Sequence, residues 1–243
     1  MSLKNELEKT GNWLFRYRSY LPFLFLPFLI YVLKEKSQLY LNSYLIISSM
    51  AISIIGEIIR ILTISFVPPR SSGRNTKRQN ASCLNQTGIY STVRHPLYLG
   101  NYFILLGPFI YTGSIYAIII YTLSFWLYYE RIMFAEEAYL SNKFGDEYQA
   151  WSNSTPAFIP NLKLYQSPSG SFSIPQIFER EYTGICGIVP IFTLLIISHN
   201  IFIKSDILLP TVWLIIFVVN TLLYIILRST KKIKRKYKYE NEN

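Results

Sequence analysis

An arginine and a histidine stand directly before a proline, where a polar part of the chain runs into an apolar one. The segment reads Gly88-Ile-Tyr-Ser-Thr-Val-Arg-His-Pro-Leu-Tyr-Leu-Gly-Asn101. Proline is favoured in the first turn of a helix, where its missing N–H costs nothing. We therefore expect a helix to begin at Pro96, with Arg94, His95 and free backbone N–H groups gathered at its N-terminus. Such a terminus can hold a polar or anionic group.

Two adjacent carboxylates, Glu136 and Glu137, follow the next pair of apolar stretches. Neither has a Lys or Arg three or four positions away, so ion pairing along a helix does not account for them. An apolar hairpin over residues 97–129 returns the chain to the side that it left. This places both carboxylates near Arg94 and His95 at the membrane–water boundary, and we expect Glu137 to meet a ligand rather than a structural partner. The alternative is a solvated face of a helix beside the membrane.

The composition indicates an integral membrane protein. Of 243 residues, 51% are hydrophobic and 16% are charged, whereas about a quarter of the residues of a soluble domain are charged. The net charge of +10 comes from cations beside apolar blocks, the pattern of cytoplasmic membrane anchoring rather than of nucleic-acid binding. Cys83 and Cys186 offer neither a disulfide framework nor metal-ligand spacing, so we expect no metal.

Six apolar stretches are predicted to be transmembrane helices. They cover residues 19–33, 39–67, 97–111, 115–129, 182–203 and 207–227. The first is a short or tilted span, because crossing a bilayer normally takes about 17–25 residues. The third and fourth are joined by the turn Thr112-Gly113-Ser114 and form a tight helical hairpin. The predicted fold is therefore all-α, with about six transmembrane helices, a hairpin core and a cytoplasmic cap.

Two ionisable residues interrupt the second span. Glu57 and Arg60 lie three positions apart, so they can face each other on one side of a helix. An ionisable residue inside a membrane is a functional-site hypothesis by default. The alternative is a mutually neutralised pair near the cytoplasmic end of the span.

Three polar segments separate or follow the spans and divide the chain into three units. Residues 68–97 form a basic loop, residues 130–182 hold four prolines and are predicted to form a cap on the membrane surface, and residues 228–238 hold seven cations. Six spans place all three segments on one side, which the positive-inside rule identifies as the cytoplasm. The units are residues 1–67 with two spans, 68–182 with the core, and 183–243 with two spans and the basic tail. We expect a multi-pass protein of a bacterial inner membrane, with its site on the cytoplasmic face.

Together the two motifs resemble the isoprenylcysteine carboxyl methyltransferase and phospholipid methyltransferase superfamily. The first is Arg-His-Pro-x-Tyr-x-Gly from Arg94 to Gly100, and the second is Glu-Glu-x-x-Leu-x-x-x-Phe-Gly-x-x-Tyr from Glu136 to Tyr148. They enclose a hairpin, and the match covers roughly residues 70–150. The resemblance implies an S-adenosylmethionine-dependent methyltransferase that binds its cofactor on the cytosolic side, while the lipid acceptor enters from the bilayer.

The resemblance also assigns cofactor-binding residues by their positions in this chain. Gly100 is expected to permit the close approach of a ligand or a helix, and residues 75 and 82–85 match by spacing alone. The cofactor-binding residues so assigned are Asn75, Ser82, Cys83, Leu84, Asn85, Tyr90, His95, Pro96, Leu97, Tyr98, Gly100, Glu136 and Glu137.

The chemistry of methyl transfer suggests which residues act on the acceptor. Displacement at a sulfonium methyl group gains most from proximity and orientation. An anionic oxygen acceptor needs no base, only a cation to orient it, and Arg94 or Arg131 suits that task; Arg131 also lies near an acceptor-binding arginine of the family. An amine acceptor must lose a proton, which leaves His95 or a glutamate as the base. The arginine-rich set favours an anionic oxygen: an isoprenylcysteine carboxylate, or a lipid phosphate such as that of lipid A.

Three other readings remain open. A phospholipid N-methyltransferase fits the same superfamily. A small transporter would fit six spans and the pair Glu57–Arg60, but the sequence shows no inverted repeats or paired broken helices. A lipid-binding scaffold held by the basic tail would need no cofactor. The two C-terminal spans lie outside the resemblance, and they could form part of the acceptor cavity or a dimer surface, so the oligomeric state is open too.

Overall fold

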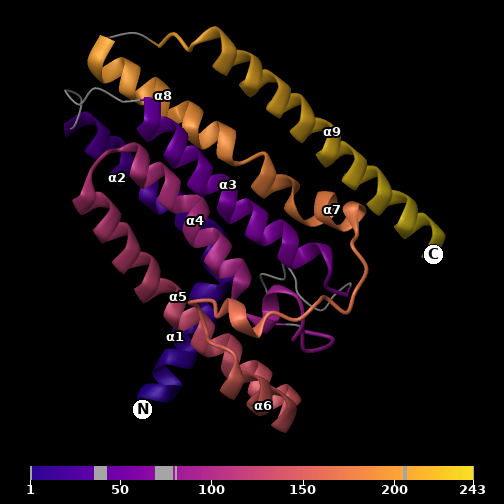
Figure 1. Ribbon diagram of the computed structural model, residues 1–243. Coiled ribbons are helices and arrows are strands. Elements are labelled where there is room, and N and C mark those ends of the chain that lie inside the picture. The colour runs from indigo at the N-terminus through magenta and orange to yellow at the C-terminus, as the bar shows by residue number, and fades with distance from the viewer. Residues whose placement is uncertain (1, 36–42, 69–78, 80, 205–206, 243) are drawn as a thin grey trace.

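Figure 1 shows the computed structural model, which describes residues 2–35, 43–68, 79, 81–204 and 207–242. Within these ranges the chain is helical and contains no strand, as the sequence predicts. The α-helices are α1 (Leu3–Tyr17), α2 (Leu21–Glu35), α3 (Ser43–Ser65), α4 (Pro96–Tyr111), α5 (Ile115–Phe144), α6 (Asp146–Ser154), α7 (Ile174–Ile185), α8 (Ile188–Lys204) and α9 (Thr211–Glu242).

Three stretches in the described part of the chain are long and apolar enough to cross a membrane. They are Tyr44–Ser65 in α3, Ile174–Ile203 across α7 and α8, and Thr211–Lys234 in α9. The predicted first and third spans correspond to α2 and α4, which have 15 and 16 residues and fall below the usual length of a span, about 17–25 residues. The membrane character is supported, whereas six spans and a cytoplasmic cap remain predictions.

Helix α5 is twice as long as the span predicted at its start. It runs for 30 residues to Phe144, because no Gly or Pro interrupts residues 115–144 and the change from apolar to polar residues at Glu130 does not itself end a helix. Gly145 ends it with a φ of +52°, a conformation that glycine adopts without steric cost.

The boundary between the predicted cap and the predicted fifth span also differs in the structure. Helix α7 begins at Ile174, inside the predicted cap, with Pro175 in its first turn, where proline starts a helix rather than breaking it. The chain turns at Cys186 and Gly187 before α8 begins. Residues 182–203 are therefore divided between two helices, and the stretch that is long and apolar enough to cross a membrane begins earlier, at Ile174.

Small residues bring α3 and α4 close together near the middle of the bundle (Figure 1). A Cβ atom at Gly56 would lie 2.6 Å from the carbonyl oxygen of Gly100, and one at Gly107 would overlap Ser53. Ser53 Oγ donates to the carbonyl oxygen of Ile104 at 2.8 Å. Interfaces of this kind let helix backbones approach within a membrane.

An aromatic core joins α4 to α5. The rings of Phe109 and Tyr121 stack with centroids 4.4 Å apart, and Phe125 packs against Tyr129 at 4.1 Å. All four side chains are buried. The hairpin that the sequence predicts is thus rigid, and it fixes where the polar half of α5 meets the start of α4.

Candidate active site

The hairpin brings the two motifs into contact. His95 Nε2 lies 2.9 Å from Glu137 Oε1, and His95 Nδ1 lies 3.6 Å from Glu136 Oε2. His95 is 5% exposed, so its imidazole is held between two carboxylates with little access to water. The structure therefore confirms the predicted proximity of His95 to Glu136 and Glu137.

Arg94 has a structural task at this corner. Its Nε and Nη2 donate to Glu137 at 3.0 and 3.3 Å, and its Nη1 donates to the carbonyl oxygens of Ser152 and Thr155 at 2.6 and 3.1 Å. The expectation that Glu137 lacks a structural partner is therefore wrong, because Arg94 and His95 both bind it. Arg94 ties α5 to the C-terminal end of α6.

The backbone N–H groups of Arg94 and His95, just before α4, are occupied. Arg94 N donates to the carbonyl oxygen of Pro156 at 2.9 Å, and His95 N donates to that of Ala157 at 3.2 Å. The segment after α6 runs beside residues 88–95 and supplies these acceptors. The site is thus built from side chains around a corner that main-chain bonds hold in place.

The charges of this cluster reinforce one another. Burial lowers the pKa of His95, but hydrogen bonding to Glu136 and Glu137 and their negative charges outweigh burial and raise it above the ordinary 6.5. Burial raises the pKa of each glutamate, but the bonds and charge of His95 outweigh it and hold both below the ordinary 4.5. Below this raised pKa, His95 is an imidazolium between two carboxylates.

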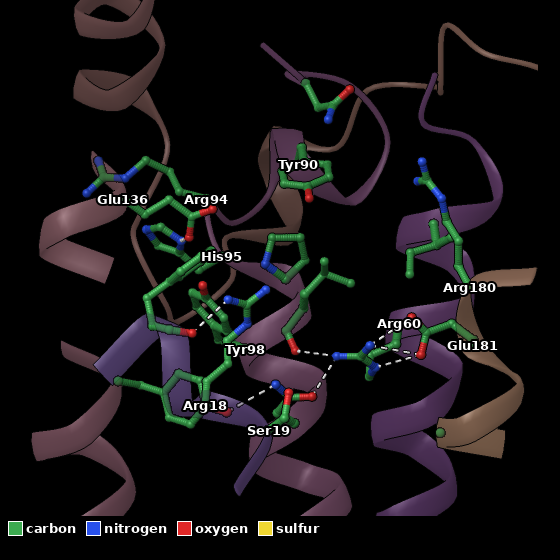
Figure 2. A pocket seen from close by; sticks show the side chains of 18 of the residues that line it. Arg18, Ser19, Arg60, Tyr90, Arg94, His95, Tyr98, Glu136, Arg180 and Glu181 are labelled. Carbon is green, nitrogen blue, oxygen red and sulfur yellow. Dashed lines mark hydrogen bonds and ion pairs between the residues drawn. The ribbon is translucent and has the colours of Figure 1, made fainter. Parts of the chain in front are cut away.

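A cavity of about 670 Å³ opens beside this cluster (Figure 2), within the range of small-molecule sites. Figure 2 shows Glu136 and His95 on one side of it and Arg180 and Glu181 on the other. Ten of the residues assigned from the sequence line it: Cys83, Leu84, Asn85, Tyr90, His95, Pro96, Leu97, Tyr98 and Glu136 of the cofactor-binding set, and Arg94.

Other assigned residues lie elsewhere. Ser82 is exposed and does not line the cavity, and neither does Arg131, an exposed residue of α5. Gly100 faces α3, where a Cβ atom would lie 2.8 Å from the carbonyl oxygen of Gly56, so it serves helix packing rather than a ligand. Glu137 does not line the cavity. Asn75 falls outside the described residues.

The pair predicted within α3 is replaced by a longer-range one. Arg60 binds Glu181 of α7 with three contacts of 2.7–3.0 Å and also donates to Asn101 Oδ1 at 2.6 Å. Glu57 instead lies against Gly184, where a Cβ atom would be 2.6 Å from its Oε2. The pairing of Glu57 with Arg60 is therefore wrong as the main contact of Arg60.

Sequence reasoning missed several lining residues, most of them distant from the motifs. They include Arg18, Asn101, Trp151, Arg180 and Glu181. Arg60, which the sequence singles out together with Glu57, lines the cavity as well. The one available signal was the second motif, whose last residue, Tyr148, lies beside Trp151 with ring centroids 5.9 Å apart. Nothing in the local sequence around Arg180 points to a ligand. Cys83 and Cys186 are both free thiols, and the described residues contain no group of three or more potential metal ligands.

Known proteins resemble the central part of the chain. Residues 47–147 match the sequence model of the phospholipid methyltransferase family. Over 85 residues the chain is 34% identical to the protein-S-isoprenylcysteine O-methyltransferase of Schizosaccharomyces pombe, which covers 35% of this chain and 36% of that protein. The corresponding enzyme of Saccharomyces cerevisiae is 31% identical over 85 residues, again 35% of this chain and 36% of that protein.

A relative that is not named as a methyltransferase is similar over a comparable share of this chain. The nickel-cobalt-cadmium resistance protein NccN of Alcaligenes xylosoxydans xylosoxydans is 40% identical over 95 residues, which is 39% of this chain and 44% of that protein. The chain therefore spans between about a third and less than half of the length of these curated relatives. No solved structure matches the chain.

Proposed function

We propose that the chain is a membrane methyltransferase that uses S-adenosylmethionine to methylate a lipid-borne acceptor. Residues 47–147 match the phospholipid methyltransferase family, and 85 residues are 34% identical to a protein-S-isoprenylcysteine O-methyltransferase. The observation that carries the proposal is the cavity where the two family motifs meet. His95 of the first motif and Glu136 of the second both line it, and the two side chains contact each other.

The residues present fit S-adenosylmethionine. Glu136 offers a carboxylate to a cationic ligand, and the described residues provide no hydrogen-bond partner for the buried Nε1 of Trp151, which lines the same cavity. A buried donor without a partner costs about 1–3 kcal/mol, so a polar ligand at this wall is favourable. When bound, the cofactor would supply a methyl group on a sulfonium sulfur. The carboxylate, tyrosines and tryptophan of this chain would hold and orient it.

The apolar part of the cavity lining suits a lipid. Apolar side chains from α1, α2, α4 and α8, or from the turns beside them, line it together: Phe15, Phe23, Ile104, Leu105, Ile188 and Ile191. A polar corner next to an apolar wall matches an amphiphile whose head carries the reacting atom. This supports a lipid or lipidated acceptor over a water-soluble one.

An anionic oxygen is the favoured acceptor. Both ring nitrogens of His95 face carboxylates, and the pKa of His95 is raised, so the ring has no free lone pair to accept a proton from an amine. The relatives named O-methyltransferases agree with this choice, and a carboxylate or a lipid phosphate meets it. The phospholipid methyltransferase match favours an amine acceptor as the second candidate.

Cofactor binding tests the central claim. Purified protein in detergent should bind labelled S-adenosylmethionine, and Glu136→Gln should weaken binding about ten- to a hundredfold, since a charge-assisted hydrogen bond is worth roughly 1.5–3 kcal/mol. Glu130→Gln is the matched control, because Glu130 is an exposed residue of the same helix outside the cavity lining. Equal affinity in both variants, or no binding by the wild type, would refute the assignment.

The pH dependence of the rate separates the two acceptors. With a total lipid extract as substrate, the rate on a carboxylate or phosphodiester oxygen should stay nearly flat from about pH 6 to 8, because the acceptor is already ionised; a phosphomonoester would bend only the low end. A rate that climbs about tenfold per pH unit would favour the phospholipid amine. Mass spectrometry of the products then identifies the acceptor.

A further inference from the structure

Helix α7 adds a wall to the cavity that the family match does not include. It begins 27 residues after the match ends at residue 147, yet Arg180, Glu181, Thr183 and Gly184 all line the cavity. Its start is attached to the end of α3, where Gln176 Nε2 donates to the carbonyl oxygens of Ile64 and Val67 at 2.7 Å each. Its middle is attached through Glu181 to Arg60. The helix therefore holds a fixed place beside the motif residues.

The arginines of the cavity differ in how they are bound. Arg60 is bound to Glu181, and Arg94 to Glu137. Arg18 lies over the ring of Phe15 and donates to its carbonyl oxygen at 2.9 Å. Arg180 forms neither an ion pair nor a hydrogen bond with any described residue, although its Nη1 is buried. A buried guanidinium nitrogen in that position is costly unless a ligand accepts its hydrogen bonds.

The lining residues beyond Arg180 become small and then apolar after one polar step. Glu181, whose carboxylate is bound to Arg60, and Thr183 come first, then Gly184 and Gly187, and then Ile188 and Ile191 at the start of α8. This order, with a guanidinium at one end and aliphatic side chains at the other, matches a lipid that carries an anionic head. Figure 2 places Arg180 across the cavity from Glu136 and His95, so an anion at Arg180 would face the side proposed to hold the cationic methyl donor.

We propose that Arg180 binds the anionic oxygen of the methyl acceptor and that the acceptor lies along the α7–α8 wall with its chain against Ile188 and Ile191. This rests on the proposed function for the identity of the reaction, but not for the binding of the anion. It assigns to a helix outside the family match the role first expected of Arg94 or Arg131. Arg94 is instead bound to Glu137, and Arg131 is exposed outside the lining.

Paired lipid probes test the binding without any turnover. A photoreactive fatty acid and the fatty alcohol of the same chain are each added to the full-length protein in detergent, and cross-links to residues 174–204 are quantified by mass spectrometry. We expect the wild type to bind the acid at least about tenfold more tightly than the alcohol, as a charge-assisted bond implies. Arg180→Gln should abolish that preference, and Arg180→Lys should keep part of it, because lysine retains the charge without the planar fork.

Controls distinguish the possible failures. Arg16→Gln, which removes an exposed arginine of α1 outside the cavity lining, should keep the preference for the acid, and size-exclusion profiles should show every variant folded. Equal binding of acid and alcohol by the wild type, or a preference that survives Arg180→Gln, would overturn the proposal.

The same variants are then titrated with S-adenosylmethionine. An affinity within about twofold of the wild type is expected for Arg180→Gln; a loss of tenfold or more would assign Arg180 to the carboxylate of the methyl donor and overturn the proposal. If the wild type binds no S-adenosylmethionine, the proposed function fails while the probe experiment still decides the role of Arg180.

Discussion

The ion pair between Arg60 and Glu181 should be a main determinant of stability. Glu181 is 0% exposed and the side chain of Arg60 is 13% exposed, and three contacts of 2.7–3.0 Å join them. Removal of one partner leaves an uncompensated buried charge, at a cost of about 3–5 kcal/mol. We therefore expect Arg60→Met and Glu181→Leu each to lower the free energy of unfolding by roughly that amount. Arg60→Met also removes a bond to Asn101, so it should be the more damaging change.

The double variant carries the test. Replacing a buried ion pair by apolar residues of similar size is often neutral or stabilising, so Arg60→Met with Glu181→Leu should regain most of what either single change loses. Unfolding of the purified protein in mixed micelles, followed by circular dichroism, gives the three free energies and their coupling. Single losses below about 1 kcal/mol, which is the level of an exposed pair, or a double variant as unstable as the sum of the two, would refute the reasoning.

Three further changes have defined outcomes. Because the pKa of His95 is raised in the folded state, the stability that its charged form contributes is complete below the ordinary value of 6.5 and is lost as the pH rises through the raised value. Thermal unfolding between about pH 6 and 9 should show this loss in the wild type and not in His95→Gln. Parallel curves for the two proteins would contradict the prediction. Gly56→Ala should destabilise by about 1–3 kcal/mol, since its Cβ would lie 2.6 Å from backbone atoms of Gly100 and Ile104, whereas Ala51→Val on the exposed side of the same helix should not. Cysteines placed at Lys77 or Lys234 should resist labelling from outside intact cells; efficient labelling would refute the predicted six-span topology.

The contact between His95 and the glutamates could be predicted because only a short helical hairpin separates them along the chain. An apolar stretch, a turn of three residues and a second apolar stretch without glycine or proline leave the chain one simple path, and that path returns Glu136 to Pro96. The end of α5 was misjudged for a related reason. Polarity changes at Glu130, but a helix ends where its backbone can leave the helical conformation, and here that place is Gly145.

The other half of the cavity could not be predicted from local patterns. The spacing of three between Glu57 and Arg60 describes only neighbours on one helix, whereas Glu181, 121 positions away, offers Arg60 two buried carboxylate oxygens. Arg180 could not be predicted for the same reason, because its importance comes from the position of α7 beside the cavity. Arg94 illustrates the opposite case: its place was predicted, but its partners Ser152 and Thr155 depend on how α6 docks.

The partners of Arg60 are synthesised at different times. A chain is synthesised from its N-terminus, so Arg60 in α3, a helix long and apolar enough to cross a membrane, is made long before Glu181. Asn101, 41 positions later, arrives first, and Glu181 follows 121 positions after the arginine. Until then the hydrogen-bond acceptors of Arg60 are the amide of Asn101 and the carbonyl of Leu97, and Glu57 of the same helix supplies a negative charge nearby. Arg60 therefore lacks its ion-pair partner through much of the synthesis, and the arrival of α7 supplies both that partner and the cavity lining formed by Arg180, Glu181, Thr183 and Gly184.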